Sequence, residues 1–118
     1  MKTKTMTISN EIGPVWIIHC YRGDVQTVDP KDGSLSWPCV SMLSEAHSCL
    51  LISTETHLDE PSAAELLAHL DRATTVKAET PHTLVCDNSK VFSEESFRES
   101  CRKLGIAITK SPPQSPQF

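Results

Sequence analysis

The chain has 118 residues, a length that suits one domain with one buried core. Its formal net charge of −4 argues against an efficient nucleic-acid binder, because phosphate binding is driven by concentrated positive charge. No stretch approaches the roughly 18 apolar residues that a membrane span requires. The polar N-terminus also lacks a hydrophobic signal region, so we expect a cytoplasmic protein.

The first half of the chain is predicted to form strands, after a polar leader at residues 1–13. Val15 to Tyr21 is apolar, β-branched and aromatic, which predicts a central strand. Residues 24–28 continue as a second strand or as the far side of a turn. A tight turn is predicted at Asp29 to Gly33, where proline presets φ and glycine supplies a positive φ.

Two further core strands are predicted at Cys39 to Leu43 and at Cys49 to Thr54, joined by a polar turn. The short connections make these two strands and the first strand antiparallel neighbours.

A helix is predicted next. Ser62 and Glu65 fit a capping box, and Pro61 lies just outside it. His69 and Asp71 are predicted to lie away from the buried side of this helix. The inward face is predicted to hold Ala63, Leu66, Leu67, Leu70 and Thr74.

A short apolar strand at Thr83 to Cys86 opens the second half, and Asp87 falls where the strand stops. Residues 88–90 have the composition of a turn. Ser93 is the predicted N-cap of a second helix, with acidic residues in its first turn.

The second helix has a predicted buried side and a predicted end. Phe92 and Phe97 are spaced for a hydrophobic staple around the N-cap. A buried stripe is predicted at Phe97, Cys101 and Leu104, and Gly105 can take the left-handed conformation that ends a helix. Residues 106–108 restart as a strand.

The resulting order, β-β-β-α-β-α-β, predicts an α/β domain with a mixed sheet over residues 14–110, as in ribonuclease-H-like cores. Residues 111–118 are rich in proline and glutamine, so we expect a flexible tail.

The segment from Asp87 onwards resembles the catalytic core of retroviral integrases and DDE transposases. The family pattern is a hydrophobic strand, D-N-G, a phenylalanine, S/T-x-x-F, a C/L-x-x-L-G-I ending and an S-P-P-x-x-P-Q loop; Ser89 replaces the usual glycine. A weaker resemblance covers residues 15–75. The residues that match are Asp87, Asn88, Phe92, Ser93, Phe97, Cys101, Leu104 to Ile106, Ser111 to Pro113, Pro116 and Gln117, and, more weakly, Trp16 to His19, Val28, Asp29, Gly33, Trp37, Pro38 and Glu60 to Ala63.

The resemblance implies DNA cutting and joining with two divalent ions, Mg or Mn, held by three carboxylates. The first carboxylate should fall at Ile18 or His19, and neither residue is a carboxylate. The second is present as Asp87. The third should lie beyond Gln117, on a helix that would follow Phe118, so we expect the C-terminal helices of the family to be lacking. With one ligand of three, we expect a catalytically inactive protein that needs no cofactor.

Alternatives remain for the metal site. Asp24 could substitute for the lost ligand if the chain doubles back, and a partner chain could supply the glutamate. His19 could ligate a softer metal such as zinc or manganese. Asp87 could instead cap backbone N–H groups at the end of its strand.

Residues 88–118 carry five basic and three acidic side chains, whereas residues 1–87 carry 6 basic and 12 acidic ones. The basic residues of the second segment could contact nucleic acid. We favour the simpler interpretation that they form the solvated face of a helix. These residues are Lys90, Arg98, Arg102, Lys103 and Lys110.

The five cysteines form an odd set without a C-x-x-C motif, which favours reduced thiols over a zinc site. There is no glycine-rich phosphate loop and no G-x-S-x-G motif, and His47 and His57 belong to no recognisable triad.

Two functions follow from the resemblance. The first is an inactive integrase-core-like protein that forms a homodimer or binds an intact transposase, with DNA binding weak or absent. The second is an active metal-dependent nuclease or strand transferase that uses Asp87 with ligands from Asp24 or a partner. A relic with no selected function is a third possibility.

Overall fold

The computed structural model describes residues 13–23, 27–28 and 30–111. Most of the predicted leader, residues 112–118 of the predicted tail, and Asp24 lie outside the described residues. The elements are β1 (Val15–Arg22), β2 (Thr27–Val28), β3 (Leu35–Ser36), β4 (Cys39–Glu45), β5 (Leu51–His57), α2 (Ala63–Lys77), β6 (Thr83–Cys86), the 3₁₀ turn η1 (Lys90–Ser93), α3 (Glu95–Lys103) and β7 (Ala107–Lys110).

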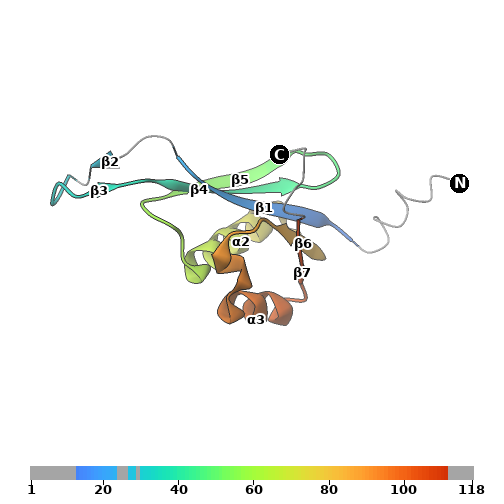
Figure 1. The fold of residues 1–118 in the computed structure, drawn as a ribbon. Coiled ribbons are helices and arrows are strands. Elements are labelled where there is room, and N and C mark those ends of the chain that lie inside the picture. The colour runs from blue at the N-terminus through green and yellow to red at the C-terminus, as the bar shows by residue number, and fades with distance from the viewer. Residues whose placement is uncertain (1–12, 24–26, 29, 112–118) are drawn as a thin grey trace, which may run out of the picture.

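Five strands form one mixed sheet in the order β5-β4-β1-β6-β7. β4 lies antiparallel to β1 and to β5, whereas β6 lies parallel to β1 and to β7. The elements of this sheet and the two α-helices follow the predicted order β-β-β-α-β-α-β, which confirms the mixed α/β fold. The short pair of β2 and β3 is inserted between β1 and β4 and projects from one end of the sheet (Figure 1).

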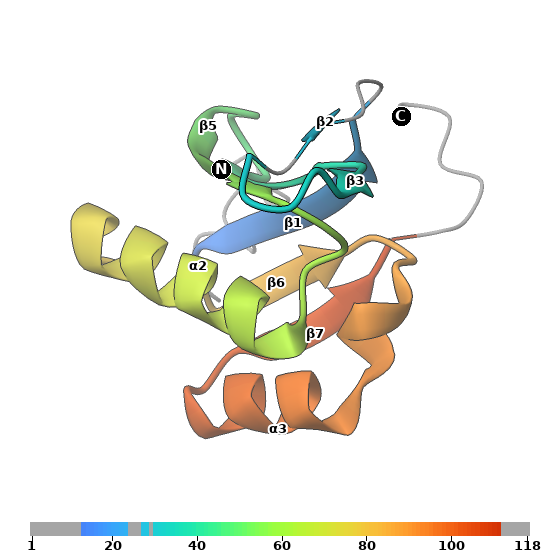
Figure 2. The same ribbon diagram turned by 90° about the vertical axis from the view of Figure 1, so that its left-hand side faces the viewer.

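Both described α-helices lie on the same side of the five-stranded sheet (Figures 1 and 2). Burial alternates along β4, where Ser41 and Leu43 are buried towards the helices and Met42 between them is only half-buried. One core therefore fills the space between sheet and helices. It contains Trp16, Ile18, Leu43, Ala63, Leu66, Leu70, Ala73, Leu84, Cys86, Val91, Phe92, Phe97, Cys101 and Ile106.

No helix among the described residues covers the opposite side of the sheet, and none is long and apolar enough to cross a membrane. Half-buried apolar side chains lie on this side, which we call the open face. They include Ile17, Val40, Met42 and Val85.

The capping box predicted for α2 is confirmed. The Ser62 hydroxyl accepts the Glu65 backbone N–H at 3.2 Å, and the Glu65 carboxylate accepts the Ser62 N–H at 2.8 Å. The prediction that His69 lies away from the core is wrong, because its side chain is fully buried. Both ring nitrogens of His69 are hydrogen-bonded to serine hydroxyls of the sheet, at Ser41 and Ser53, and this pairing makes a polar ring tolerable on the inward face.

The start of α3 differs from the prediction. Ser93 is the last residue of η1, and the N-cap is Glu94, which makes no side-chain capping bond. The Ser93 hydroxyl instead accepts a hydrogen bond from the Lys110 ammonium. Phe92 and Phe97 do make the predicted contact, with ring centroids 5.2 Å apart.

A second correction concerns Leu104 and follows from the way in which α3 ends. Leu104, predicted to be buried, is 59% exposed, whereas Ile106 is 4% exposed and joins the core. Gly105 has the predicted positive φ of 79°, with its N–H bonded to the Arg102 carbonyl and the Ile106 N–H bonded to the Cys101 carbonyl. These two hydrogen bonds form a Schellman motif, which ends the helix and changes the direction of the backbone at Gly105. Ile106, and not Leu104, therefore points into the core.

Candidate functional site

The structure places Asp87 at the carboxyl end of β6, directly beside β1. Ile18 of β1 and Cys86 of β6 are partners in the parallel pair, so the residues that follow them lie at the same end of the sheet. The sheet thus brings together the two chain positions at which the family resemblance places its first two carboxylates.

Both carboxylate oxygens of Asp87 accept backbone hydrogen bonds. One oxygen accepts the N–H of Cys20 on β1, and the other accepts the N–H of Ser89 in the turn after β6, each at 2.7 Å. Asp87 therefore ties the end of β1 to the start of η1. This is the geometry of the capping role that was one alternative for this residue.

The first-carboxylate position contributes no acidic side chain. Ile18 is fully buried in the core, and its partner across the sheet is a leucine of β4. His19 is half-buried on the open face, where its ring packs edge-on against Tyr21 with centroids 6.2 Å apart. The structure thus brings neither Ile18 nor His19 to Asp87 as an oxygen ligand, and Asp24 lies outside the described residues.

A thiol that sequence reasoning did not single out lies beside this carboxylate. Burial and the negative charge of Asp87, with smaller contributions from Cys39 and Glu60, raise the pKa of Cys20 to about 12. Cys20 and Glu60 also line a small pocket of about 90 Å³ together with Ser89. Burial and the neighbouring carboxylate therefore disfavour the thiolate form of Cys20 at neutral pH.

The described residues do not fit a divalent ion at Asp87. Mg²⁺ and Mn²⁺ favour several oxygen ligands around one point, and Mg²⁺ gives up its water reluctantly. Across residues 13–23, 27–28 and 30–111, no three His, Cys, Asp or Glu side chains converge as a metal site. Each Asp87 oxygen is also already an acceptor for a backbone N–H.

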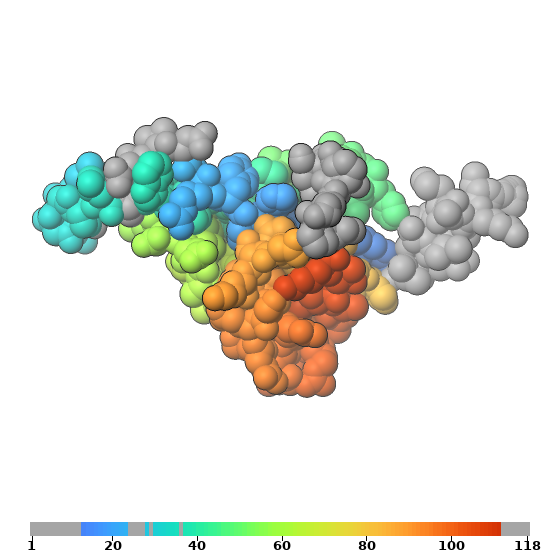
Figure 3. Space-filling view, viewed as in Figure 1, coloured from blue at the N-terminus to red at the C-terminus, as the bar shows by residue number. Residues whose placement is uncertain are grey.

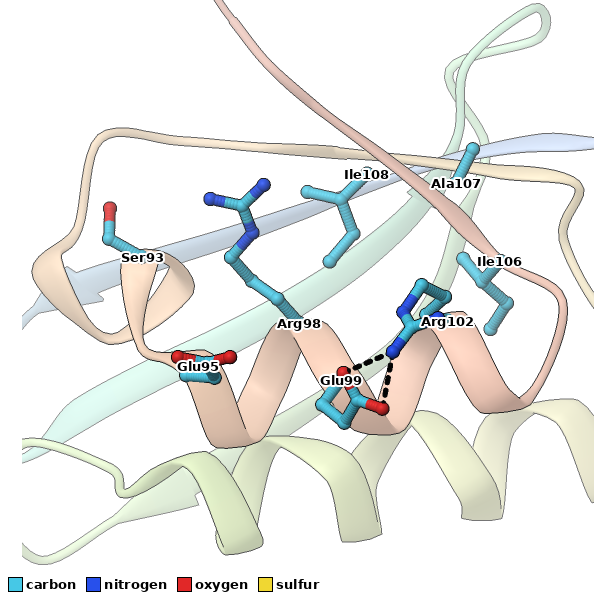
Figure 4. A pocket seen from close by; sticks show the side chains of 8 residues that line it. All are labelled: Ser93, Glu95, Arg98, Glu99, Arg102, Ile106, Ala107 and Ile108. Atoms are coloured by element: carbon cyan, nitrogen blue, oxygen red, sulfur yellow. Dashed lines mark hydrogen bonds and ion pairs between the residues drawn. The ribbon is translucent and has the colours of Figure 1, made fainter.

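The five basic residues lie on η1, α3 and the end of β7, which form one continuous surface (Figure 3). A cleft of about 540 Å³ opens between α3 and β7 on this surface, and Arg98 and Arg102 line it together with Glu95 and Glu99 (Figure 4). Arg102 donates to both carboxylate oxygens of Glu99 at 2.5 Å, and Lys110 is bonded to Ser93. Glu99 therefore offsets the positive charge of Arg102 at this cleft, as on a solvated helix face.

Comparison with known proteins identifies the fold. No protein-family model and no curated protein matches the chain. Among solved structures, a chain in the cryoEM structure of the simian T-cell lymphotropic virus intasome with PP2A regulatory subunit B56 gamma is 16% identical, with a TM-score of 0.64; the match covers 87% of this chain and 36% of that one.

The catalytic core domain of HTLV-2 integrase, solved with magnesium, is also similar. Its dimeric and trimeric forms are each 16% identical, with TM-scores of 0.58 and 0.59, and each match covers 80% of this chain and 58% of that one. This chain therefore has the ribonuclease-H-like fold of integrase catalytic cores and spans 36% to 58% of the length of these matched chains.

The hydrogen bonds of Asp87 predict a structural cost for its removal. We expect Asp87→Ala to lower the free energy of unfolding by roughly 1–3 kcal/mol, because two partly buried N–H groups lose their acceptor. Asp87→Asn should cost less, since one amide oxygen remains. Urea unfolding measures both, with Asn88→Ala at the exposed next position as the control. Unchanged or increased stability in Asp87→Asn would show that the carboxylate does not have this role.

Proposed function

We propose that this chain is an integrase-core-like protein related to DNA integration or transposition that is catalytically inactive and acts through binding. The fold of the integrase catalytic cores supports the relation to DNA integration. The single observation that supports inactivity is the Asp87 carboxylate, whose two oxygens accept the N–H groups of Cys20 and Ser89. Among the described residues, no group of three or more His, Cys, Asp or Glu side chains that could hold a metal ion includes it.

The proposed inactivity follows from the small number of negative charges at the site. A two-ion mechanism requires several carboxylates to hold two dications about 4 Å apart, because each ion must be partly stripped of water and the ions repel one another. Asp87 alone supplies one negative charge. At the neighbouring position of β1, the apolar side chain of Ile18 lies inside the core and offers no oxygen.

A plasmid-nicking assay tests inactivity. We expect the wild-type protein and the Asp87→Asn variant to give the same background nicking with either Mg²⁺ or Mn²⁺. Metal-dependent nicking by the wild type that disappears in Asp87→Asn would instead establish the active nuclease, with further ligands from Asp24 or a partner chain.

Self-association is the form of binding that we propose for the open face. The half-buried side chains of Ile17, Val40, Met42 and Val85 lie there without a covering helix among the described residues. Apolar surface of this kind is commonly covered by a partner, and closed dimers are the commonest assemblies. The HTLV-2 integrase core has been solved in dimeric and trimeric forms, which is in keeping with this proposal.

The same surface gives a route to a mixed assembly. A chain that binds an intact transposase while contributing no metal ligands would reduce the activity of that transposase. For DNA we propose at most weak binding, through Lys90, Arg98, Arg102, Lys103 and Lys110, because Glu99 already pairs with Arg102.

Light scattering with size-exclusion chromatography tests the dimer. At high micromolar concentration we expect the mass of two chains for the wild type and of one chain for Met42→Lys, which places a charge on the open face. Val76→Lys is the matched control, because Val76 is 85% exposed on α2. A monomeric wild type, or a Met42→Lys variant that remains a dimer, would contradict self-association through this face.

A further inference from the structure

Four buried or partly buried side chains form a continuous hydrogen-bonded chain between the sheet and α2. The Ser41 hydroxyl lies 2.8 Å from Nε2 of His57 and 2.7 Å from Nδ1 of His69. Nε2 of His69 lies 2.7 Å from the Ser53 hydroxyl. Ser41 and His69 are fully buried and His57 is 8% exposed. We call these four residues the serine–histidine chain.

The serine–histidine chain crosses three elements. Ser41 belongs to β4, Ser53 and His57 belong to β5, and His69 belongs to α2. At its outer end, Nδ1 of His57 lies 4.0 Å from the carboxylate of Glu65, the exposed capping-box residue of α2. Within the described residues, no buried side-chain nitrogen or oxygen atom lacks a hydrogen-bond partner, so every link of the chain is in use.

The number of hydrogen atoms available for donation limits the directions that the hydrogen bonds of the serine–histidine chain can take. Ser41 has one hydroxyl hydrogen, so in the neutral chain it donates to one imidazole and accepts from the other. The bonds therefore all point one way or all point the other. The negative charge of Glu65 favours the direction in which His57 carries its hydrogen on Nδ1, facing the carboxylate. Ser41 then donates to His57, His69 donates from Nδ1 to Ser41, and Ser53 donates to His69.

We propose that the serine–histidine chain is a one-proton relay that carries a proton from the Ser53 end to His57, where Glu65 balances the charge. The Ser53 hydroxyl passes its proton to Nε2 of His69, takes up a proton from solvent and turns to become an acceptor. The Nδ1 proton of His69 moves to the Ser41 oxygen, and the former Ser41 proton moves to Nε2 of His57. The net change is one proton taken up, with every hydrogen bond kept and the tautomer of His69 inverted.

The relay takes one proton and not two. With both imidazoles charged, Ser41 would accept from both rings, and its own hydrogen would be left without a partner in a fully buried position. The charged groups around the chain place the single charge on His57. Glu65 of α2 lies 4.0 Å from His57. Glu55 of β5 acts electrostatically on both imidazoles, and Arg72 of α2, which opposes a charge on His69, is paired with Glu55 at 2.6 Å. On β4, the buried Cys39 is the register partner of His57.

Burial lowers the pKa of His69 below its ordinary value of about 6.5, so the folded state disfavours a charge there. The unfolded chain protonates His69 below about pH 6.5, whereas the folded chain keeps it neutral. The contribution of neutral His69 to stability is therefore complete above that pH and is lost as the pH falls through the window below it. The relay therefore leaves His69 neutral when it takes up the first proton.

Nitrogen NMR of the histidine side chains tests the relay directly. At pH 8 we expect His69 as the Nδ1–H tautomer. As the pH falls and His57 becomes a cation, His69 should change to the Nε2–H tautomer over the same pH range, while the protein stays folded. His57→Gln and His69→Gln assign the signals. A His69 tautomer that does not change, a His69 cation that forms first, or unfolding before any proton uptake would each overturn the proposal.

Two variants isolate the parts of the relay. Ser41→Ala should uncouple the histidines, so that His69 keeps one tautomer while His57 titrates. Glu65→Gln preserves the capping box and the fold but removes the charge that sets the direction of the bonds, so His69 should show a mixture of both tautomers at pH 8. Glu95→Gln on α3 is the matched control and should leave the tautomer unchanged. An unchanged His69 tautomer in Glu65→Gln would overturn the assigned role of Glu65.

Discussion

The structure around the candidate site depends on one interaction, the pair of hydrogen bonds that Asp87 accepts from Cys20 and Ser89. These bonds join the central strand of the sheet to the turn that leads into the second helix. A carboxylate at this position can coordinate a metal ion or accept hydrogen bonds from backbone N–H groups. The described residues provide it with two backbone donors and with no group of three metal-ligating side chains, which is why we assign it a structural role.

Much of the fold could be predicted from local sequence signals. Ser62 and Glu65 specify the start of α2, Gly105 specifies the end of α3, and β-branched residues specify the central strand, because each signal acts within a few residues. The position of Asp87 at the end of a strand was predictable for the same reason. That its two oxygens accept N–H groups from β1 and from the next turn was not, since one partner lies 67 residues away in the sequence.

The failures share a physical cause. His69 is predicted to lie away from the buried side of its helix, yet serines on two strands satisfy both ring nitrogens and allow its burial. Helical spacing predicts a buried Leu104, but the helix ends before this residue, and Ile106 is buried in its place. Ser93 is a residue type that is common at N-caps, but its hydroxyl instead accepts a hydrogen bond from Lys110, 17 residues further along the chain. In each case a contact made only in the tertiary structure outweighs the local preference.

The two polar features of the domain are neighbours in the sheet. Ser41, at the centre of the serine–histidine chain, is the partner of Cys20, whose N–H group holds Asp87. The polar side chains next to β1 and β4, Asp87 and Ser41, thus both make hydrogen bonds within the protein. The domain has the fold of an integrase catalytic core, and these polar groups of its described residues are hydrogen-bonded within the protein.

Paramagnetic broadening by Mn²⁺ tests the central claim about Asp87 most directly. Amide spectra recorded during a titration with Mn²⁺ report any ion that resides near a given N–H group. We predict that the Cys20 and Ser89 amide signals broaden no more than those of other surface amides at millimolar Mn²⁺. Selective broadening of these two signals at micromolar Mn²⁺, absent in Asp87→Asn, would contradict the account and place a metal ion at this carboxylate.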